Sequence, residues 1–114
     1  MKSLFGNQYL RYANEMWGRR VIQEPWGFAT YDIKGRHIYI ADMFIEPELR
    51  GIGHGQKVEA KIIKIGKDAG CDFLVCKVHK TDANWKTNLK IYTDHCDYRV
   101  LEETDDFIGL VKEI

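Results

Sequence analysis

The sequence contains few of the residues that interrupt or cross-link a chain, with two prolines and three cysteines among 114 residues. No proline-rich or low-complexity stretch marks a linker, and a chain of this length predicts one domain over residues 1–114. An odd number of cysteines in no framework spacing argues against a disulfide scaffold. Cys71, Cys76 and Cys96 instead favour reduced thiols in a reducing compartment.

Net charge is also lacking, because 17 basic side chains balance 17 acidic ones. Nucleic-acid binders usually carry a basic surplus, so a nucleic-acid partner is not expected. No apolar run approaches the length that crosses a bilayer, and the first 20 residues contain no apolar stretch of the signal-peptide type. We therefore expect no membrane partner and a cytoplasmic location.

The first half of the chain predicts a helix followed by a long hairpin. Residues 4–18 carry apolar side chains at mixed three-to-five spacing, which indicates a short helix. The aromatic and β-branched residues of 26–33 predict a strand, Lys34-Gly35 a tight turn, and 36–46 a second, longer strand. Only about 25 residues precede this hairpin, enough for one helix and little else.

The second half alternates helices and strands. Val58, Ile62, Ile65 and Ala69 lie on one face of a helix that runs to about Gly70. Inside that helix a glycine at position 66 costs roughly 1 kcal/mol against alanine, which suggests that it permits close packing. The run 71–79 is apolar on both faces and reads as a central strand.

A second amphipathic helix is predicted by Trp85, Leu89 and Tyr92, and a terminal hairpin by residues 98–103 and 107–114. The order predicts a mixed α/β domain whose strand–helix–strand crossover, residues 38–79, is parallel and right-handed.

Three glycines at alternate positions in ELRGIGHGQK, residues 48–57, stand where the second strand of the hairpin gives way to a helix. The start of a helix has unpaired N–H groups and a partial positive charge, and it binds anions. Glycines also let a ligand approach the main chain closely. The spacing fits neither the P-loop pattern, which needs Gly-Lys-Ser/Thr, nor the GxGxxG dinucleotide turn. Taken alone, the glycines could simply make a turn.

The pattern Arg50-x-x-Gly53-x-Gly55, after a strand that ends in Ile45-x-Pro47, resembles the acyl-CoA signature of the GNAT family of N-acetyltransferases. The resemblance extends from about Trp26 to the end of the chain. It implies a mostly antiparallel sheet with a central parallel pair, 38–46 and 71–79, that splays to admit acetyl-CoA. The implied activity is transfer of an acetyl group directly to a primary amine of a small molecule or protein.

The same resemblance implies which residues hold the acyl donor. The main chain of the strand before the glycines would pair with the pantetheine arm, as an added strand does at a sheet edge. The amides of the glycine turn would hold the pyrophosphate, and an asparagine that opens the second helix would touch the cofactor. These residues are Met43, Phe44, Ile45, Arg50, Gly51, Ile52, Gly53, His54, Gly55, Gln56 and Asn84.

For catalysis, Tyr92 matches the family tyrosine that protonates the departing thiolate. An attacking amine must be neutral, so a base is also needed. Asp42 is the acid in the middle of the strand before the glycines, next to Ala41, where several relatives carry the acid. Glu46 is a second candidate for the base, and a water chain is a third.

Other interpretations of the sequence remain open. A shortened N-terminus and Ala41 allow a catalytically reduced module that binds acyl-CoA or another protein. A homodimer is possible, because a small body otherwise leaves its cleft and sheet edges bare. An acidic cluster near the last turn is either a solvated hairpin tip or a site for a cationic amine. Its members are Glu102, Glu103, Asp105 and Asp106.

The cysteines and histidines of the second half fit no common structural zinc spacing, so no metal is expected. The set comprises Cys71, Cys76, His79, His95 and Cys96. A cysteine nucleophile is disfavoured as well, because no thiol stands next to an obvious base.

Overall fold

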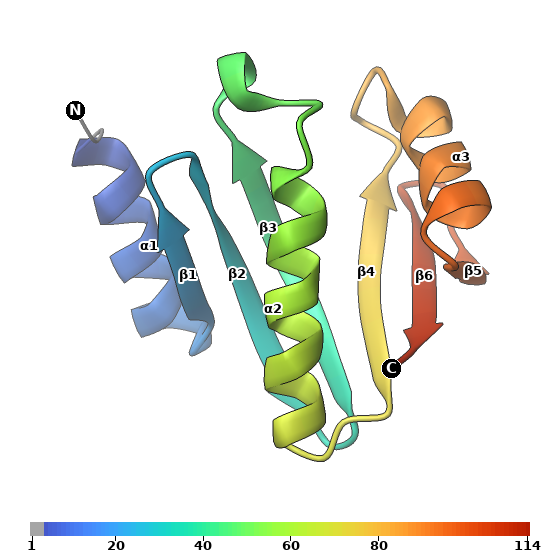
Figure 1. Ribbon diagram of the computed structural model, residues 1–114, viewed down its shortest axis with the longest axis horizontal. Coiled ribbons are helices and arrows are strands. Elements are labelled where there is room, and N and C mark those ends of the chain that lie inside the picture. Colours follow the sequence, from blue (N-terminus) through green and yellow to red (C-terminus); the bar gives the residue numbers. More distant parts are fainter. Residues whose placement is uncertain (1–3) are drawn as a thin grey trace.

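The computed structural model describes residues 4–114 and contains one six-stranded sheet with strand order β1-β2-β3-β4-β6-β5 (Figure 1). Neighbouring strands are antiparallel except β3 and β4, which are parallel. The mixed α/β architecture and the central parallel pair expected from the sequence are confirmed.

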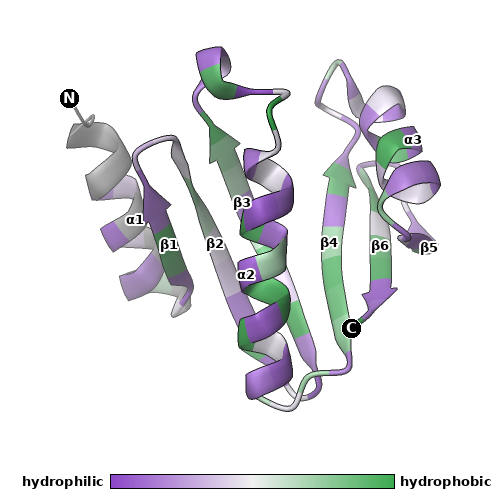
Figure 2. Cartoon of the chain, viewed as in Figure 1, coloured by the Kyte–Doolittle hydropathy of each residue, from purple (hydrophilic) through white to green (hydrophobic). Residues whose placement is uncertain are grey.

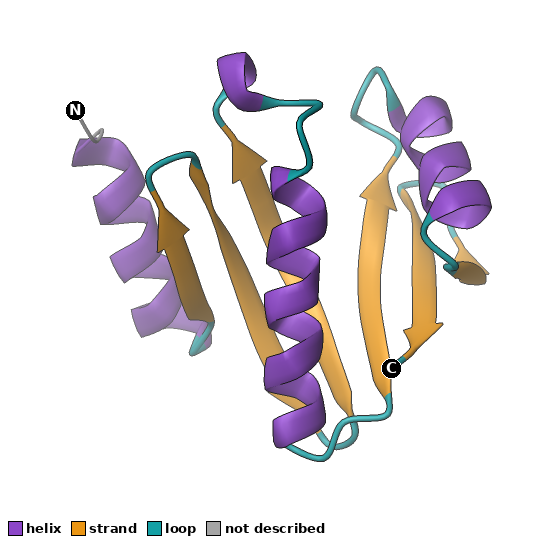
Figure 3. Cartoon of the chain, in the orientation of Figure 1, coloured by secondary structure: helices purple, strands orange, loops and turns teal. Residues whose placement is uncertain are grey.

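The helices and strands follow the predicted order with two additions, a short strand before the hairpin and a 3-10 helix within the glycine turn region. The elements are α1 (Leu4–Trp17), β1 (Arg20–Glu24), β2 (Gly27–Lys34), β3 (His37–Ile45), η1 (Pro47–Leu49), α2 (His54–Asp68), β4 (Phe73–His79), α3 (Trp85–His95), β5 (Arg99–Glu103) and β6 (Phe107–Glu113) (Figure 3). The expectation of little besides a helix before the hairpin was wrong. The short strand β1 forms there because β2 supplies an antiparallel partner in full register.

The core lies between α2 and the sheet. Ile38, Val58, Ile62, Leu74 and Leu110 are fully buried, and Figure 2 shows hydrophobic residues gathered along the strands while the helices alternate in character. These five residues come from four elements, so the core joins both halves of the chain.

The predicted close packing at Gly66 is confirmed. A Cβ at this position would stand 2.9 Å from Cγ2 of Ile38 and 3.1 Å from Cδ1 of Ile114. The missing side chain therefore lets α2 lie directly on β3.

A β-bulge at Ala41 determines which face each residue of β3 presents. Thr30 pairs with Asp42, but the next residue of β2, Tyr31, pairs with Ile40. Since paired residues share a face and neighbours alternate, Asp42 points to the opposite face from Ile40. We call the two surfaces the α2 face, which includes Ile38 and Met43, and the α1 face, which includes Thr30 and Asp42. Figure 1 shows α2 in front of the sheet and α1 on its more distant side.

Candidate active site

The two parallel strands separate after a short paired stretch. Only His37, Ile38 and Tyr39 of β3 pair with β4, and the last pair is Tyr39 with Val75. Both strands continue, β3 to Ile45 and β4 to His79. The main-chain groups of their carboxyl-terminal halves that face each other are therefore left without a strand partner, so an extended ligand can pair with them.

A cavity of about 590 Å³ occupies this opening. Its walls are formed mainly by β3, the first two turns of α2, β4 and α3. Met43, Gly55 and Gln56 of the predicted donor-binding set line it, as do both predicted catalytic residues, Tyr92 and Asp42. The fold thus brings together residues that lie 50 positions apart in the sequence.

The glycine turn forms a tight connection from β3 through η1 to α2. Gly51 and Gly53 have φ angles of 79° and 93°, a left-handed conformation that favours glycine. Gly53 is the N-cap, and its carbonyl accepts a hydrogen bond from Lys57 N–H at 3.2 Å. The N–H groups of residues 54–56 consequently have no partner inside the helix and can bind an anion.

Side chains at the two ends of the turn hold it in place. Nε of Arg50 donates to the Ile45 carbonyl at 2.9 Å, and its guanidinium lies 5.6 Å from the centre of the Phe44 ring. His54 stacks on Trp26 with ring centroids 5.2 Å apart. The turn is therefore anchored to the strand that precedes it and to the β1–β2 connection.

Tyr92 is a half-buried residue of α3 that faces the cavity. Burial, with smaller contributions from Cys76, Cys96, Glu59 and Asp82, raises the pKa of its hydroxyl above 10.0. The hydroxyl therefore stays protonated at neutral pH. A protonated phenol next to the opening between the strands is able to donate a proton to a leaving group.

Asp42 is held by three donors that all reach the same carboxylate oxygen. Oδ2 accepts hydrogen bonds from the Thr30 hydroxyl at 2.6 Å, the Tyr9 hydroxyl at 2.8 Å and Nη1 of Arg19 at 3.4 Å. Oδ1 receives none of these three bonds. The carboxylate is thus fixed in orientation through one oxygen, and among the contacts of the described residues Oδ1 accepts no hydrogen bond. Glu46, the other acidic candidate, is exposed and follows the last residue of β3.

Asn84 lies at the N-cap of α3, exposed and outside the cavity lining. Its N–H donates to Oδ1 of Asp82 at 2.8 Å. One turn later, Asn88 lines the cavity and donates to Oδ2 of Asp82 at 3.4 Å. The sequence analysis assigned the asparagine that opens the helix and so missed Asn88. Asn88 lies four residues before Tyr92, and this spacing, which places both side chains on one helix face, could have identified it.

A polar cluster beneath α2 and α3 was also missed. Glu59 pairs with Lys112 at 2.6 Å, with side chains only 17% and 19% exposed. Tyr98 is buried, and burial above all raises the pKa of its hydroxyl, with hydrogen bonding to Glu59 among the further causes. Burial also raises the pKa of Cys76 to about 12, so this thiol is inert at neutral pH. The pairing is not visible in the sequence because Glu59 and Lys112 lie 53 positions apart.

The cysteines and histidines considered for zinc are spread over the molecule. Cys71 is buried in the core, whereas Cys76 and Cys96 line the cavity. Within residues 4–114, no group of three or more histidine, cysteine or acidic side chains is arranged to hold a metal ion.

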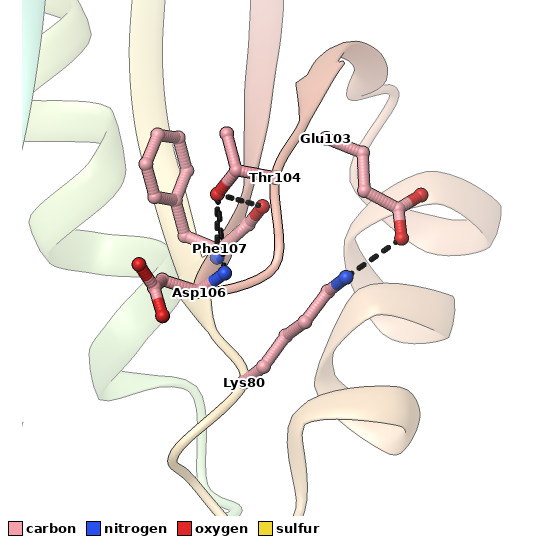
Figure 4. Close-up of polar contacts among 5 residues, drawn as sticks. All are labelled: Lys80, Glu103, Thr104, Asp106 and Phe107. Carbon is pink, nitrogen blue, oxygen red and sulfur yellow. Dashed lines mark hydrogen bonds and ion pairs between the residues drawn. The ribbon is translucent and has the colours of Figure 1, made fainter.

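The acidic hairpin tip is tied to the loop after β4 (Figure 4). Nζ of Lys80 forms an ion pair with Oε2 of Glu103 at 2.8 Å, and the main-chain N–H of Lys80 donates to the Asp106 carbonyl at 2.9 Å. The Thr104 hydroxyl accepts from the N–H groups of Asp106 and Phe107 at 3.2 and 3.1 Å. One of the four acidic side chains of the cluster is therefore engaged in an ion pair within the chain. None of the described helices is both long enough and apolar enough to span a membrane.

The proteins that this chain resembles in sequence include N-acetyltransferases. A 41-residue segment is 44% identical to a thialysine N-epsilon-acetyltransferase of Bos taurus, covering 36% of this chain and 24% of that protein. The matched segment thus spans about a quarter of the length of this curated relative.

Solved structures share the fold. A PaiA N-acetyltransferase from Thermoplasma acidophilum in complex with coenzyme A superimposes with a TM-score of 0.66 at 17% identity, covering 77% of this chain and 53% of that one. The ribosomal-protein-S18-alanine N-acetyltransferase from Escherichia coli gives 0.70 at 15% identity, covering 94% and 76%. Residues 2–87 match the Acetyltransferase (GNAT) family. With the splayed parallel strands and the glycine turn in the expected places, the chain belongs to the GNAT acetyltransferase family.

Proposed function

We propose that the protein is an acetyl-CoA-dependent N-acetyltransferase that transfers the acetyl group directly to a primary amine of a small molecule or a protein. The observation that carries the proposal is the opening between β3 and β4, which contains Tyr92 and ends at the glycine turn. Membership of the GNAT family and the coenzyme A complex of a structural relative support it.

Acetyl-CoA fits the groups that the chain presents. The diphosphate would lie at the N–H groups of residues 51–56, and the pantetheine arm would pair with the edge of residues 43–45 that faces away from β2 and has no partner in β4. Gln56 and Asn88 supply further polar groups along the wall. We assign Asn88, rather than Asn84, to the donor side because Asn88 lines the cavity.

The proposed reaction is a single displacement. A neutral amine attacks the thioester carbonyl, a C–N bond forms, and the C–S bond breaks. The Tyr92 hydroxyl gives its proton to the departing thiolate. Oδ1 of Asp42 takes the proton from the amine, directly or through water, while Tyr9, Thr30 and Arg19 hold Oδ2. Glu46 is the reserve base.

We further propose a cytoplasmic location and a homodimer. Three free cysteines fit a reducing compartment. Strand β5 is an edge strand, and all five of its residues are exposed, which suits pairing with a second copy.

The function is tested with isothermal titration of acetyl-CoA followed by a thiol-release assay over a panel of diamines, aminoglycosides, amino acids and peptides. We expect saturable binding and release that depends on an acceptor. Binding without release for any acceptor would identify a module that binds acyl-CoA only. Absence of binding would contradict the proposal.

A further inference from the structure

Tyr98 contacts Tyr92 in two ways, although it lies outside the helix that carries Tyr92. The two rings meet edge to face, with centroids 5.6 Å apart and an interplanar angle of 74°. The N–H of Tyr98 also donates to the Tyr92 carbonyl at 3.2 Å. One residue therefore restrains both the ring and the main chain of the predicted proton donor.

Tyr98 is itself held on its remaining sides. It is 4% exposed. Nζ of Lys112 lies 5.2 Å from its ring centre and pairs with Glu59 at 2.6 Å. Burial, with smaller contributions from Cys76 and Glu59, raises the pKa of the Tyr98 hydroxyl, which therefore stays neutral. A buried aromatic ring that packs against a second ring and a cation has little freedom to move.

The loop between the two tyrosines has a conformation that delivers Tyr98 to this position. Asp97 has a φ angle of 63°, which glycine adopts readily and few other residues do; aspartate is one of the exceptions. The N–H of Cys96 donates to the Tyr92 carbonyl at 3.2 Å. The chain therefore turns back immediately after α3, and the next side chain packs under the helix.

We propose that Tyr98 is a positioning residue that fixes the ring of Tyr92 in the cavity, with Glu59 and Lys112 holding Tyr98. This inference rests on the proposed function, in which Tyr92 gives a proton to the leaving thiolate. Small displacements of a catalytic group lower the rate of the chemical step, whereas donor binding through the glycine turn is unaffected.

A double-mutant cycle tests the proposal. Tyr98→Leu should lower kcat roughly 10- to 100-fold while the Kd for acetyl-CoA stays unchanged. In the Tyr92→Phe background the same change should have almost no further effect on kcat, because its target is gone. Tyr98→Phe, which keeps the ring, should recover most of the loss. An equal effect of Tyr98→Leu in both backgrounds would overturn the inference.

Two further measurements separate positioning from instability and from failure of the proposed function. Tyr31→Leu removes another buried tyrosine, on β2 and outside the cavity lining, and should lower the melting temperature without lowering kcat. In addition, the order parameter of a ¹³C-labelled Tyr92 ring should fall in Tyr98→Leu and not in Tyr31→Leu. This second readout requires no turnover, so it decides the packing inference even if the wild type acetylates nothing; an unchanged order parameter would refute it.

Discussion

The Thr30 hydroxyl donates a 2.6 Å hydrogen bond to Oδ2 of Asp42 from the neighbouring strand. Thr30 is a polar residue, yet its side chain is fully buried in the described part of the chain. Because the Ala41 bulge aligns these two residues, the carboxylate is oriented from inside the sheet. This arrangement makes the role of Asp42 testable by a change that alters its proton affinity but not its shape.

For Asp42→Asn we expect kcat to fall about 100-fold or more, because an amide cannot accept the proton of the attacking amine and general bases contribute at least that factor. Binding of acetyl-CoA should be unchanged by calorimetry. Glu46→Gln tests the reserve base and should stay within about threefold, because Glu46 is exposed and lies outside the cavity lining. If both variants keep full activity, water is the base.

For Tyr92→Phe we expect a loss of about 100-fold in kcat with an unchanged Kd for acetyl-CoA. The raised pKa of Tyr92 also sets a pH dependence. The hydroxyl donates a proton only below its pKa, so the wild-type rate should stay high through pH 10 and fall above it. The residual activity of Tyr92→Phe should not fall in this alkaline range. If the rates of both proteins fall at the same pH, another group is responsible for the decrease.

Gly53→Ala should weaken acetyl-CoA binding and lower stability by about 1–2 kcal/mol, since its φ of 93° disfavours a side chain. Gly70→Ala is a matched control. Its φ is 84°, and a Cβ there meets nothing within 4 Å, but the residue follows the far end of α2. It should lose similar stability in urea titrations and keep the wild-type affinity. Equal affinity of all three proteins would place the diphosphate elsewhere.

Gly66→Ala should destabilise the fold by about 1–3 kcal/mol, despite the better helix propensity of alanine. The new Cβ would lie 2.9 Å from Cγ2 of Ile38, a fully buried, β-branched residue that cannot move aside. Lys67→Ala, the next position and exposed, should change the free energy of unfolding by less than about 0.5 kcal/mol. Chemical denaturation measures both, and a stabilised Gly66→Ala would contradict the packing described for α2.

The Cys76 thiol should make the fold less stable in alkali. Its pKa is 9.0 when exposed and about 12 in the fold. The neutral form is favoured by folding, so the stabilisation is complete below pH 9 and is lost as the pH rises toward 12. Between pH 8 and pH 10 the loss should be about 1.4 kcal/mol. Cys76→Ala should show a correspondingly smaller decrease in urea titrations at the two pH values.

Much of the architecture was predictable from the sequence because local patterns specify it. The hydrophobic period changes from two to 3.6 residues at ELRGIGHGQK, which predicts the strand, the turn and the helix. The two glycines with left-handed backbone, Gly51 and Gly53, lie within this turn. Asn84 and Asn88 show the limit. Residue type did not distinguish them. The four-residue spacing from Tyr92 favours Asn88, but only the path of the β4–α3 loop decides which asparagine faces the opening.

By itself, the sequence determined the central crossover, the glycine turn and the residues on the inner face of α2, since each depends on backbone preferences and hydrophobic period within a few consecutive residues. Only the tertiary structure decided the direction of Asp42, the burial of the Glu59–Lys112 pair and the contact of Tyr98 with Tyr92. A one-residue bulge reverses the face of every later side chain in a strand, and Glu59 and Lys112, 53 residues apart, meet only through packing. The contact of Tyr98 with Tyr92 depends on the left-handed turn at Asp97. None of these three features follows from residue type or hydrophobic period alone.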